Sequence, residues 1–479
     1  MGEEINAVEF TEKDFENFRQ YLQTETQLLS SWFTNNQLSS HPDKAGFELE
    51  VWIVDKDANP IPLNDSFLEK LNDSLFSPEL SRFNIELNGD PENLHRDALS
   101  RLQSSLEKSW KHCTQVAKEF DASLIMIGIL PSVTDEQLVL ENMSKMKRYF
   151  ALNKQVLAHR KGKPLILDIS GKEHLKTQHH DVMLESATTS FQLHWQIPIE
   201  KSVRAYNASI IASAATVAIS ANSPFLFGKE LWDETRIPLF EQAVEVGGFN
   251  DAAFGPTKRV SFGSSYARQS IMEVFQENIE HYPILLPVNY EEASNQLKYL
   301  RLHNGTLWRW NRPLIGFDIK TEQPHIRIEH RVIAAGPTIT DSLANAAFYY
   351  GLANYLSNLD TPPEQELPFS TAKDNFYNAA KSSLHANVKW LNDYNGKMKP
   401  LLEKQLIPNA EEGLRQLELS EDDINFYINI IKQRVSNEQT GANWLLNYKK
   451  KNNCTMQQLT AAYAKQQNTA KPVHTWPIV

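Results

Sequence analysis

Two short segments carry acidic side chains at a spacing that could build a metal-binding surface. In GFELEVWIV, Glu48 and Glu50 are two residues apart, so an extended strand would point both carboxylates to the same side. RFNIELNGD repeats the arrangement with Glu86 between two asparagines. The apolar residues between these groups would face the other way, so each segment predicts a strand with one apolar and one polar face.

Two later segments place other chemistry on a polar face of the same kind. In SFQLHWQIP, Gln192 and His194 alternate with apolar residues. In PHIRIEHRV, Arg327, Glu329 and Arg331 recur at every second position, with isoleucines between them. None of the four polar faces carries a lysine. This selection of residue types favours a functional surface over an arbitrary solvated one.

Grouped together, these side chains would form a site for divalent cations. Two carboxylates ~4 Å apart repel by roughly 4 kcal/mol at an effective dielectric constant near 20, so a glutamate cluster needs positive charge beside it. Oxygen ligands with one imidazole suit Mg²⁺ or Mn²⁺ better than zinc. The expected metal-site residues are Glu48, Glu50, Glu86, His194 and Glu329. For each strand alone, the alternative is the solvated face of an ordinary antiparallel sheet.

Arginines beside such a cluster indicate an anionic substrate, because a guanidinium group binds phosphate or carboxylate oxygens through two parallel hydrogen bonds. The candidates are Arg236, Arg309, Arg312, Arg327 and Arg331. A phosphoryl-transfer site would use the same residue types, since its catalysis depends mainly on positioning and charge neutralisation. The alternative is that Arg327 and Arg331 pair with Glu329 in a structural network. The chain has no glycine-rich phosphate loop, so a nucleotide would need another architecture.

Composition excludes several other classes. A formal net charge of −11 argues against a nucleic-acid partner. Only two cysteines occur, Cys113 and Cys454, which excludes a disulfide framework and favours a reducing compartment. The start of the chain has no signal-peptide features, so we expect a cytoplasmic location. The apolar stretch from Ala205 to Ala221 is too short and too polar to span a bilayer, so we expect a buried helix and no membrane partner.

Hydrophobic periodicity locates the elements that must position these residues. It predicts helices over residues 11–32 and 99–120, and from Asp341 as N-cap to before Pro362. The apolar run that starts at Leu124 and ends at Pro131 predicts a strand buried on both faces.

A proline pair, Pro362 and Pro363, marks the predicted boundary between a catalytic part, residues 1–360, and a helical C-terminal segment, residues 361–479. Strand patterning is lost after this point, and Ser420 with Asp423 resembles a capping box. This segment could be a lid, a scaffold, or a dimerisation element that would make the protein a homo-oligomer.

Taken in order, these motifs resemble the glutamate-cysteine ligases of the second class and related carboxylate–amine ligases of the glutamine-synthetase-like superfamily. The resemblance covers roughly Ala45 to Leu352. Its landmarks are GFELEVW, FNIELNGDP, TSFQLHWQIP, NSPFLFG, WDETR, LWRWNRP and HIRIEHR. No single motif is specific, but their succession along the chain is.

The resemblance implies an α+β fold, in which a curved antiparallel β-sheet carries the active site on its concave face and is flanked by helices. It also implies ATP as co-substrate with two or three Mg²⁺ or Mn²⁺ ions. The γ-carboxylate of L-glutamate would join an amino acid or amine, L-cysteine above all, through an acyl phosphate, as in glutathione biosynthesis.

Motif positions carry the family's site residues to this chain. Arg331 and Arg327 would steady the transferring phosphoryl group. The substrate would be held by Arg236, Asn222 and Arg309, and the nucleotide by Gln192 and Arg312.

Two other functions stay open at this point. A metal-dependent hydrolase could use the same carboxylates to activate water. A non-catalytic relative could keep the site only to bind nucleotide. Phosphate release from ATP that requires glutamate would distinguish the ligase from both.

Overall fold

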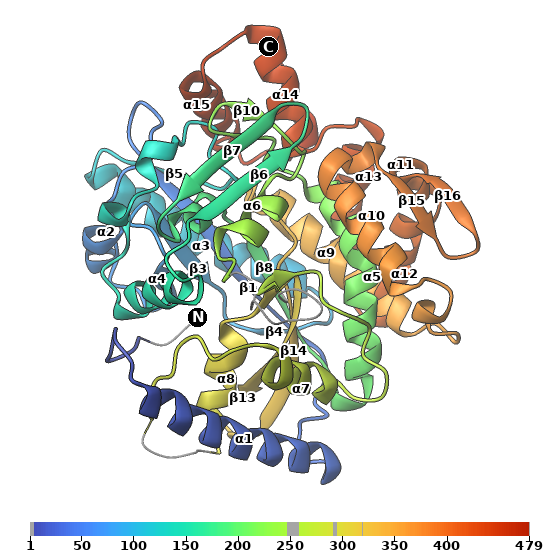
Figure 1. Cartoon of the computed structure of the whole chain (residues 1–479). Coiled ribbons are helices and arrows are strands. Elements are labelled where there is room, and N and C mark those ends of the chain that lie inside the picture. The colour runs from blue at the N-terminus through green and yellow to red at the C-terminus, as the bar shows by residue number, and fades with distance from the viewer. Residues whose placement is uncertain (1–3, 247–257, 291–294, 319, 479) are drawn as a thin grey trace.

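The computed structural model describes residues 4–246, 258–290, 295–318 and 320–478, and its centre is a curled antiparallel sheet (Figure 1). Its main strands follow the order β13-β14-β8-β1-β3-β2. The four segments with alternating faces form four neighbouring strands, as expected. They are β1 (Lys44–Val54), β3 (Asn84–Asn88), β8 (Phe191–Gln196) and β14 (Pro324–His330).

The register of these strands aligns their polar side chains in rows. Glu50 of β1 lies opposite Glu86 of β3, and Glu48 lies opposite Gln192 of β8. On the other side of β8, His194 lies opposite Glu329 of β14. Because side chains on one face of a sheet stand beside their cross-strand partners, four distant segments of sequence meet on one surface.

The remaining strands are short or lie at the edges. Those joined to the main sheet are β2 (Phe76–Pro78), β4 (Glu92–Asn93), β5 (Ser123–Ile125) and β13 (Asn311–Phe317). The others form two-stranded pairs: β6 (Leu165–Ser170) with β7 (His174–His179), β9 (Phe225–Leu226) with β10 (Lys229–Glu230), β11 (Val260–Ser261) with β12 (Trp308–Arg309), and β15 (Asn387–Trp390) with β16 (Tyr394–Lys397).

Helices surround the sheet. Those before the proline pair are α1 (Glu12–Thr34), α2 (Asn64–Leu71), α3 (Ala98–Glu119), α4 (Lys147–His159), α5 (Ser202–Ser220), α6 (Arg236–Ala243), α7 (Met272–His281), α8 (Lys298–Gly305) and α9 (Ile339–Ser357). Those after it are α10 (Phe369–Ser382), α11 (Met398–Leu401), α12 (Ile407–Gln416), α13 (Glu421–Ser436), α14 (Gly441–Asn452) and α15 (Met456–Gln467).

Helix α9 covers the apolar face of the sheet. Its Tyr349 packs edge-on against Trp195 of β8, with ring centroids 6.4 Å apart. Its Tyr350 hydroxyl donates hydrogen bonds to the backbone carbonyls of Gly46 (3.2 Å) and His194 (3.1 Å). Helix α5 packs beside α9 and is buried over nearly its whole surface, as its uniformly small and apolar sequence predicts. Among the described residues, no helix is long and apolar enough to cross a membrane.

Local signals in the sequence explain where the outer helices begin. Thr11 caps α1 and forms the reciprocal capping box with Asp14. Helix α3 buries a stripe that includes Leu99, Leu106 and Cys113, so this cysteine is part of the core.

Three local predictions were wrong. Only the first two residues of the apolar run from Leu124 belong to strand β5, and the rest is irregular but buried, since burial alone does not distinguish strand from packed loop. The N-cap of α9 is Thr338, whose hydroxyl accepts from the Asp341 backbone N–H, and not Asp341 itself. The C-terminal segment contains a hairpin, β15–β16, besides its helices.

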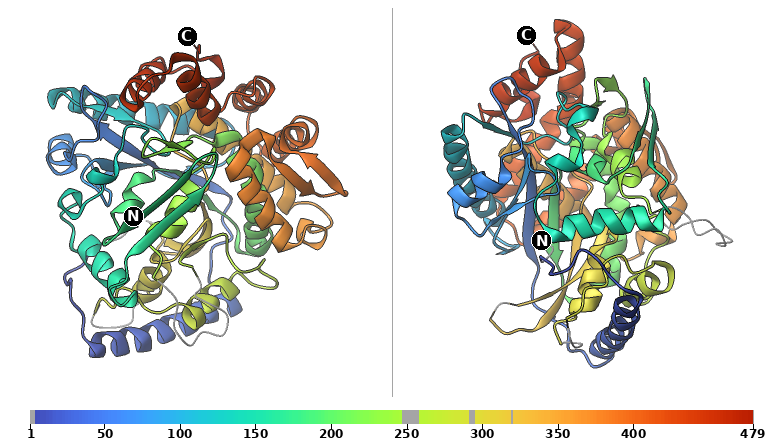
Figure 2. Two further views of the ribbon diagram at one scale, coloured as in Figure 1. Left: turned by 45° about the horizontal axis from the view of Figure 1, so that its top comes forward. Right: turned by 60° about the vertical axis from the view of Figure 1, so that its left-hand side comes forward.

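The C-terminal segment packs on the apolar side of the sheet. Helices α10, α12 and α13 lie against α5 and α9 (Figure 1), whereas α14 and α15 lie at the end of the molecule opposite α1 in all views (Figure 2). Ser420 caps α13, but the Asp423 carboxylate accepts hydrogen bonds from the Leu99 and Ser100 backbone N–H groups instead of closing a capping box. The division at residue 360 stays a prediction.

The contact between α9 and α12 generates a test of this packing. A Cβ atom on Gly413 of α12 would lie 1.8 Å from the backbone oxygen of Gly351 in α9. We therefore expect Gly413→Ala to lower the free energy of unfolding by about 1–3 kcal/mol or more, since overpacking forces the helices apart. Chemical denaturation measures this change. The matched control is Gly305→Ala in α8, where a Cβ meets nothing within 4 Å. Equal stability of the two variants would contradict the close approach.

Candidate active site

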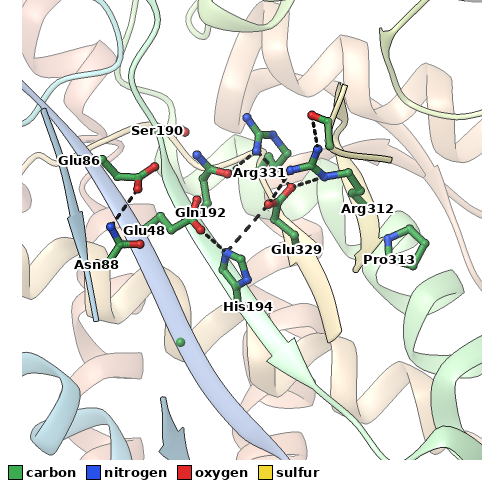
Figure 3. Close-up of polar contacts among 12 residues, drawn as sticks. Glu48, Glu86, Asn88, Ser190, Gln192, His194, Arg312, Pro313, Glu329 and Arg331 are labelled. Carbon is green, nitrogen blue, oxygen red and sulfur yellow. Dashed lines mark hydrogen bonds and ion pairs between the residues drawn. The ribbon is translucent and has the colours of Figure 1, made fainter. Parts of the chain in front are cut away.

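One group of metal-ligand type side chains brings together β1, β8 and β14 on the polar face of the sheet (Figure 3). The Nε2 atom of His194 lies 3.4 Å from Glu48 Oε1 and 4.0 Å from Glu329 Oε1. This Nε2 atom is buried and has no hydrogen-bond partner among the described residues. Two carboxylates and an unpartnered imidazole nitrogen that converge in this way fit a divalent cation.

A second group consists of Glu50, Glu79 and Glu86, each with an oxygen within 4.8 Å of the others. Glu50 accepts hydrogen bonds from the Ser190 backbone N–H (2.7 Å) and the Gln192 amide (2.6 Å). These donors fix the Glu50 carboxylate, and three all-oxygen ligands fit Mg²⁺ or Mn²⁺. Glu79, which follows the short strand β2, was missed by sequence reasoning because no alternating pattern surrounds it.

The two groups differ in the direction of their pKa shifts. Burial alone would raise the pKa of Glu329, but the Arg312 and Arg331 guanidinium groups outweigh it and lower this pKa to about 2. In the second group, burial raises the pKa of Glu50 to about 7, and burial with three neighbouring carboxylates raises the pKa of Glu79 well above its usual value. The charged form is therefore favoured at Glu329 and disfavoured at Glu50 and Glu79.

Arg331 lies between the two groups. Its Nη1 donates to Glu329 Oε2 (3.1 Å) and to Gln192 Oε1, while the amide nitrogen of Gln192 donates to Glu50. The Arg331 side chain and Gln192 thus connect the Glu329 carboxylate to the Glu50 carboxyl group. This position gives Arg331 access to an anion that contacts both groups.

Arg312 is committed to protein contacts. Its guanidinium group binds both oxygens of Glu329 at 2.9 Å, and its Nη1 donates to the backbone oxygens of Asn304, Gly305 and Leu307 at 3.3–3.4 Å. These bonds orient Glu329 and the turn that follows α8. The sequence suggested that Arg312 contacts the nucleotide. Such a contact would be additional to the structural role that these hydrogen bonds give it.

A cavity of about 290 Å³ is lined by the carboxylates of both groups, whereas His194 is not among its lining residues. Every predicted glutamate lines it, and so do Gln192, Arg312, Arg327 and Arg331. The lining also includes charged and phenolic residues that sequence reasoning did not single out: Glu79, Arg148, Tyr149, Glu185, Lys298 and Arg301. Several of these lie on helices α4 and α8, whose approach to the sheet no local pattern encodes.

Three predicted substrate-binding residues do not line the cavity. Arg309 is buried and contacts Asn278 and, at 3.1 Å, Glu277. Arg236 and Asn222 are also buried, and their side chains form hydrogen bonds with other groups of the protein. Direct substrate contact by these three residues therefore has no support in their positions.

Comparison with known proteins agrees with the overall fold. Similar folds occur in the glutamate–cysteine ligase of Francisella tularensis, solved in complex with AMP (12% identity, TM-score 0.56, 92% of this chain and 91% of that chain) and in a bifunctional glutathione synthetase of Pasteurella multocida (11% identity, TM-score 0.50, 95% and 55%). No curated protein sequence matches this chain.

Fold similarity at such low sequence identity does not assign a family, but the match to a family model does. It describes glutamate-cysteine ligase family 2 and matches residues 44–465, a range that includes both carboxylate groups and most of the C-terminal segment. The protein belongs to glutamate-cysteine ligase family 2 and is an ATP-dependent carboxylate–amine ligase.

Proposed function

We propose that the protein joins the γ-carboxylate of L-glutamate to the amino group of a second substrate, with L-cysteine as the first choice. A γ-carboxylate oxygen attacks the terminal phosphorus of ATP and ADP leaves, which forms an acyl phosphate. The amine nitrogen then attacks the acyl carbon, phosphate leaves and the nitrogen loses a proton. The observation that supports this assignment is the arrangement of Arg331 between two carboxylate groups in one cavity.

Divalent ions are part of the proposal, with Mg²⁺ or Mn²⁺ as the candidates. Glu48, His194 and Glu329 would hold one ion, and Glu50, Glu79 and Glu86 another. Such ions, when bound, neutralise phosphate oxygens and align them for in-line displacement. The protein's own contribution is to orient these ligands through Arg312, Gln192 and Ser190.

The cationic side chains that line the cavity would have two roles, one towards the phosphoryl group and one towards the substrate. Arg331 and Arg327 would stabilise the transferring phosphoryl group, because a guanidinium group stays charged and binds two oxygens at once. The Nε atom of Arg327 is buried without a hydrogen-bond partner among the described residues, which leaves it a donor for a ligand. Arg148 and Arg301 also line the cavity and replace Arg236, Asn222 and Arg309 as our candidates for substrate carboxylates.

The decisive assay is ADP release from MgATP. We expect release to require L-glutamate and to rise further when L-cysteine is added, because the second half-reaction clears the acyl phosphate. A panel of amino acids and amines then identifies the acceptor. ATP hydrolysis that is indifferent to glutamate, or hydrolysis of other substrates without nucleotide, would refute the ligase assignment to this site.

Removing one ligand charge tests the first carboxylate group. Glu329→Gln keeps the side-chain shape but loses the negative charge, so we expect kcat to fall by about 100-fold or more while the circular dichroism spectrum is unchanged. Steady-state kinetics measures this. The control is Glu412→Gln, an exposed residue of α12. Near-normal turnover of Glu329→Gln would show that Glu329 is not a metal ligand.

The raised pKa values predict how pH and metal affect stability. In the unfolded chain Glu50 and Glu185 ionise near pH 4.5, whereas burial raises their pKa values in the folded protein to about 7 and about 8. The folded state binds more protons, so their contribution to stability is present below pH 4.5 and is lost as pH rises towards 8. We expect the melting temperature in EDTA to fall over this range, and Mg²⁺ to restore it most at the alkaline end.

Differential scanning calorimetry between pH 5.5 and 8.5, with EDTA and with MgCl₂, measures this effect. The variant Glu50→Gln serves as the comparison, since it cannot ionise and should show a flatter pH profile. A stabilisation by Mg²⁺ that is equal at every pH would contradict proton displacement from this group.

A further inference from the structure

A chain of buried polar groups runs from the last helix of the protein to the backbone of Arg331. We propose that helix α15 of the C-terminal segment positions Arg331 through this chain, so that Tyr463 and Gln467 are positioning residues of the active site. The proposal rests on the proposed function only in taking Arg331 to act on the phosphoryl group.

The chain begins on α15. The Gln467 amide nitrogen donates to the backbone oxygens of Met126 (2.9 Å) and Pro337 (2.7 Å), and its oxygen accepts from the Met126 N–H (3.2 Å). One turn earlier, the Tyr463 hydroxyl donates to Met126 O (3.0 Å) and accepts from the Asn222 amide (2.8 Å). Both side chains are at most 4% exposed, so these bonds have no competition from bulk water.

Asn222 transmits the contact to the segment that follows β14. Its side-chain nitrogen donates to Ala335 O (2.8 Å), and its backbone N–H donates to Glu234 Oε2 (2.8 Å). The first residue of α14 packs directly on it, since a Cβ atom on Gly441 would lie 2.0 Å from Asn222 Oδ1. Two helices of the C-terminal segment, α14 and α15, therefore contact Asn222.

Glu234 and Arg236 complete the connection. Glu234 Oε1 accepts from Arg236 Nε at 3.0 Å, and the Arg236 guanidinium group donates to the backbone oxygens of Arg331 (3.2 Å) and Val332. Glu234 and Arg236 are 1% and 2% exposed. This pairing explains why an arginine is buried here without lining the cavity.

The segment from Arg331 to Pro337 is thus held by three side chains. Arg236 binds its first two residues, Asn222 binds Ala335, and Gln467 binds Pro337. Ala335 also donates its backbone N–H to Thr189, whose neighbour Ser190 binds Glu50. A shift of this segment would therefore displace the Arg331 side chain and the support of the second carboxylate group together.

A displacement of the Arg331 side chain would lower the rate of the reaction. A misplacement of about 1 Å at a reacting group, caused by a change far from the chemistry, can cost on the order of 100-fold in rate. Because Tyr463 and Gln467 lie on a helix that does not line the cavity, their substitution should change turnover and leave substrate binding almost unaltered.

The test is Tyr463→Phe, which removes one hydroxyl and keeps the ring. We expect kcat for glutamate-dependent ADP release to fall by about 10-fold, with the KM values for ATP and glutamate changed less than twofold. In an Arg331→Lys background the same substitution should have less than a twofold effect, because Arg331 is the group that the chain positions. The matched control is Tyr448→Phe on α14, whose ring stacks on Trp444, a neighbour of the Tyr463 ring, but whose hydroxyl takes no part in this chain of hydrogen bonds.

Hydrogen exchange gives a readout that does not depend on activity. We expect peptides covering residues 331–337 to exchange at least threefold faster in Tyr463→Phe than in Tyr448→Phe, and the same in Gln467→Met. Equal exchange in these variants and the control, or an equal loss of kcat in both Arg331 backgrounds, overturns the proposal. Absence of glutamate-dependent ADP release in the wild-type protein overturns the proposed function instead, and the exchange comparison then decides the coupling alone.

Discussion

The concentration of negative charge on one face of the sheet is the constraint to which the rest of the site responds. Six glutamates, four of them from three strands of the sheet, line one cavity, where their mutual repulsion is far less screened than in water. The structure compensates this negative charge in two ways. Near Glu329, two arginines supply the opposing charge. Around Glu50, Glu79 and Glu86, burial raises the carboxyl pKa values, which favours the uncharged acids over the carboxylates.

This division gives the two halves of the site different requirements. Arg312 and Arg331 lower the pKa of Glu329 and so favour its carboxylate form. Burial raises the pKa of Glu50, Glu79 and Glu86, so a cation proposed to bind there would have to compete with protons. Arg331 and Gln192 join the two halves, so a change in one is transmitted to the other.

The sheet could be predicted from the sequence because alternation is a local signal. A two-residue period fixes which side chains share a face, whatever the strand's neighbours are. The order of the motifs then indicated a family, and with it the curved sheet. The same signals failed for the apolar run after Leu124, where uniform hydrophobicity reports burial and says nothing about backbone hydrogen bonding.

The part of the site that lies off the sheet could not be predicted in this way. Glu79 is in a turn, and Arg148 and Arg301 are on helices whose approach to the sheet depends on long-range packing. For an arginine, the residue type alone also does not show whether the side chain lines the cavity or is buried in the interior. Arg236 has the same chemistry as Arg331, but its donors face backbone carbonyls in the interior, which no spacing in the sequence reveals.

The pairing of β14 with β8 and of β8 with β1 has a consequence for how such a chain can change over time. Substitutions leave the odd–even phase of each strand intact, whereas deleting one residue inverts it from that point onward. Past a deletion in β14, the ionic residues would enter the interior against α9 while isoleucines faced the cavity. Length variation should therefore be confined to the loops between these strands, and the strands themselves should diverge by replacement alone.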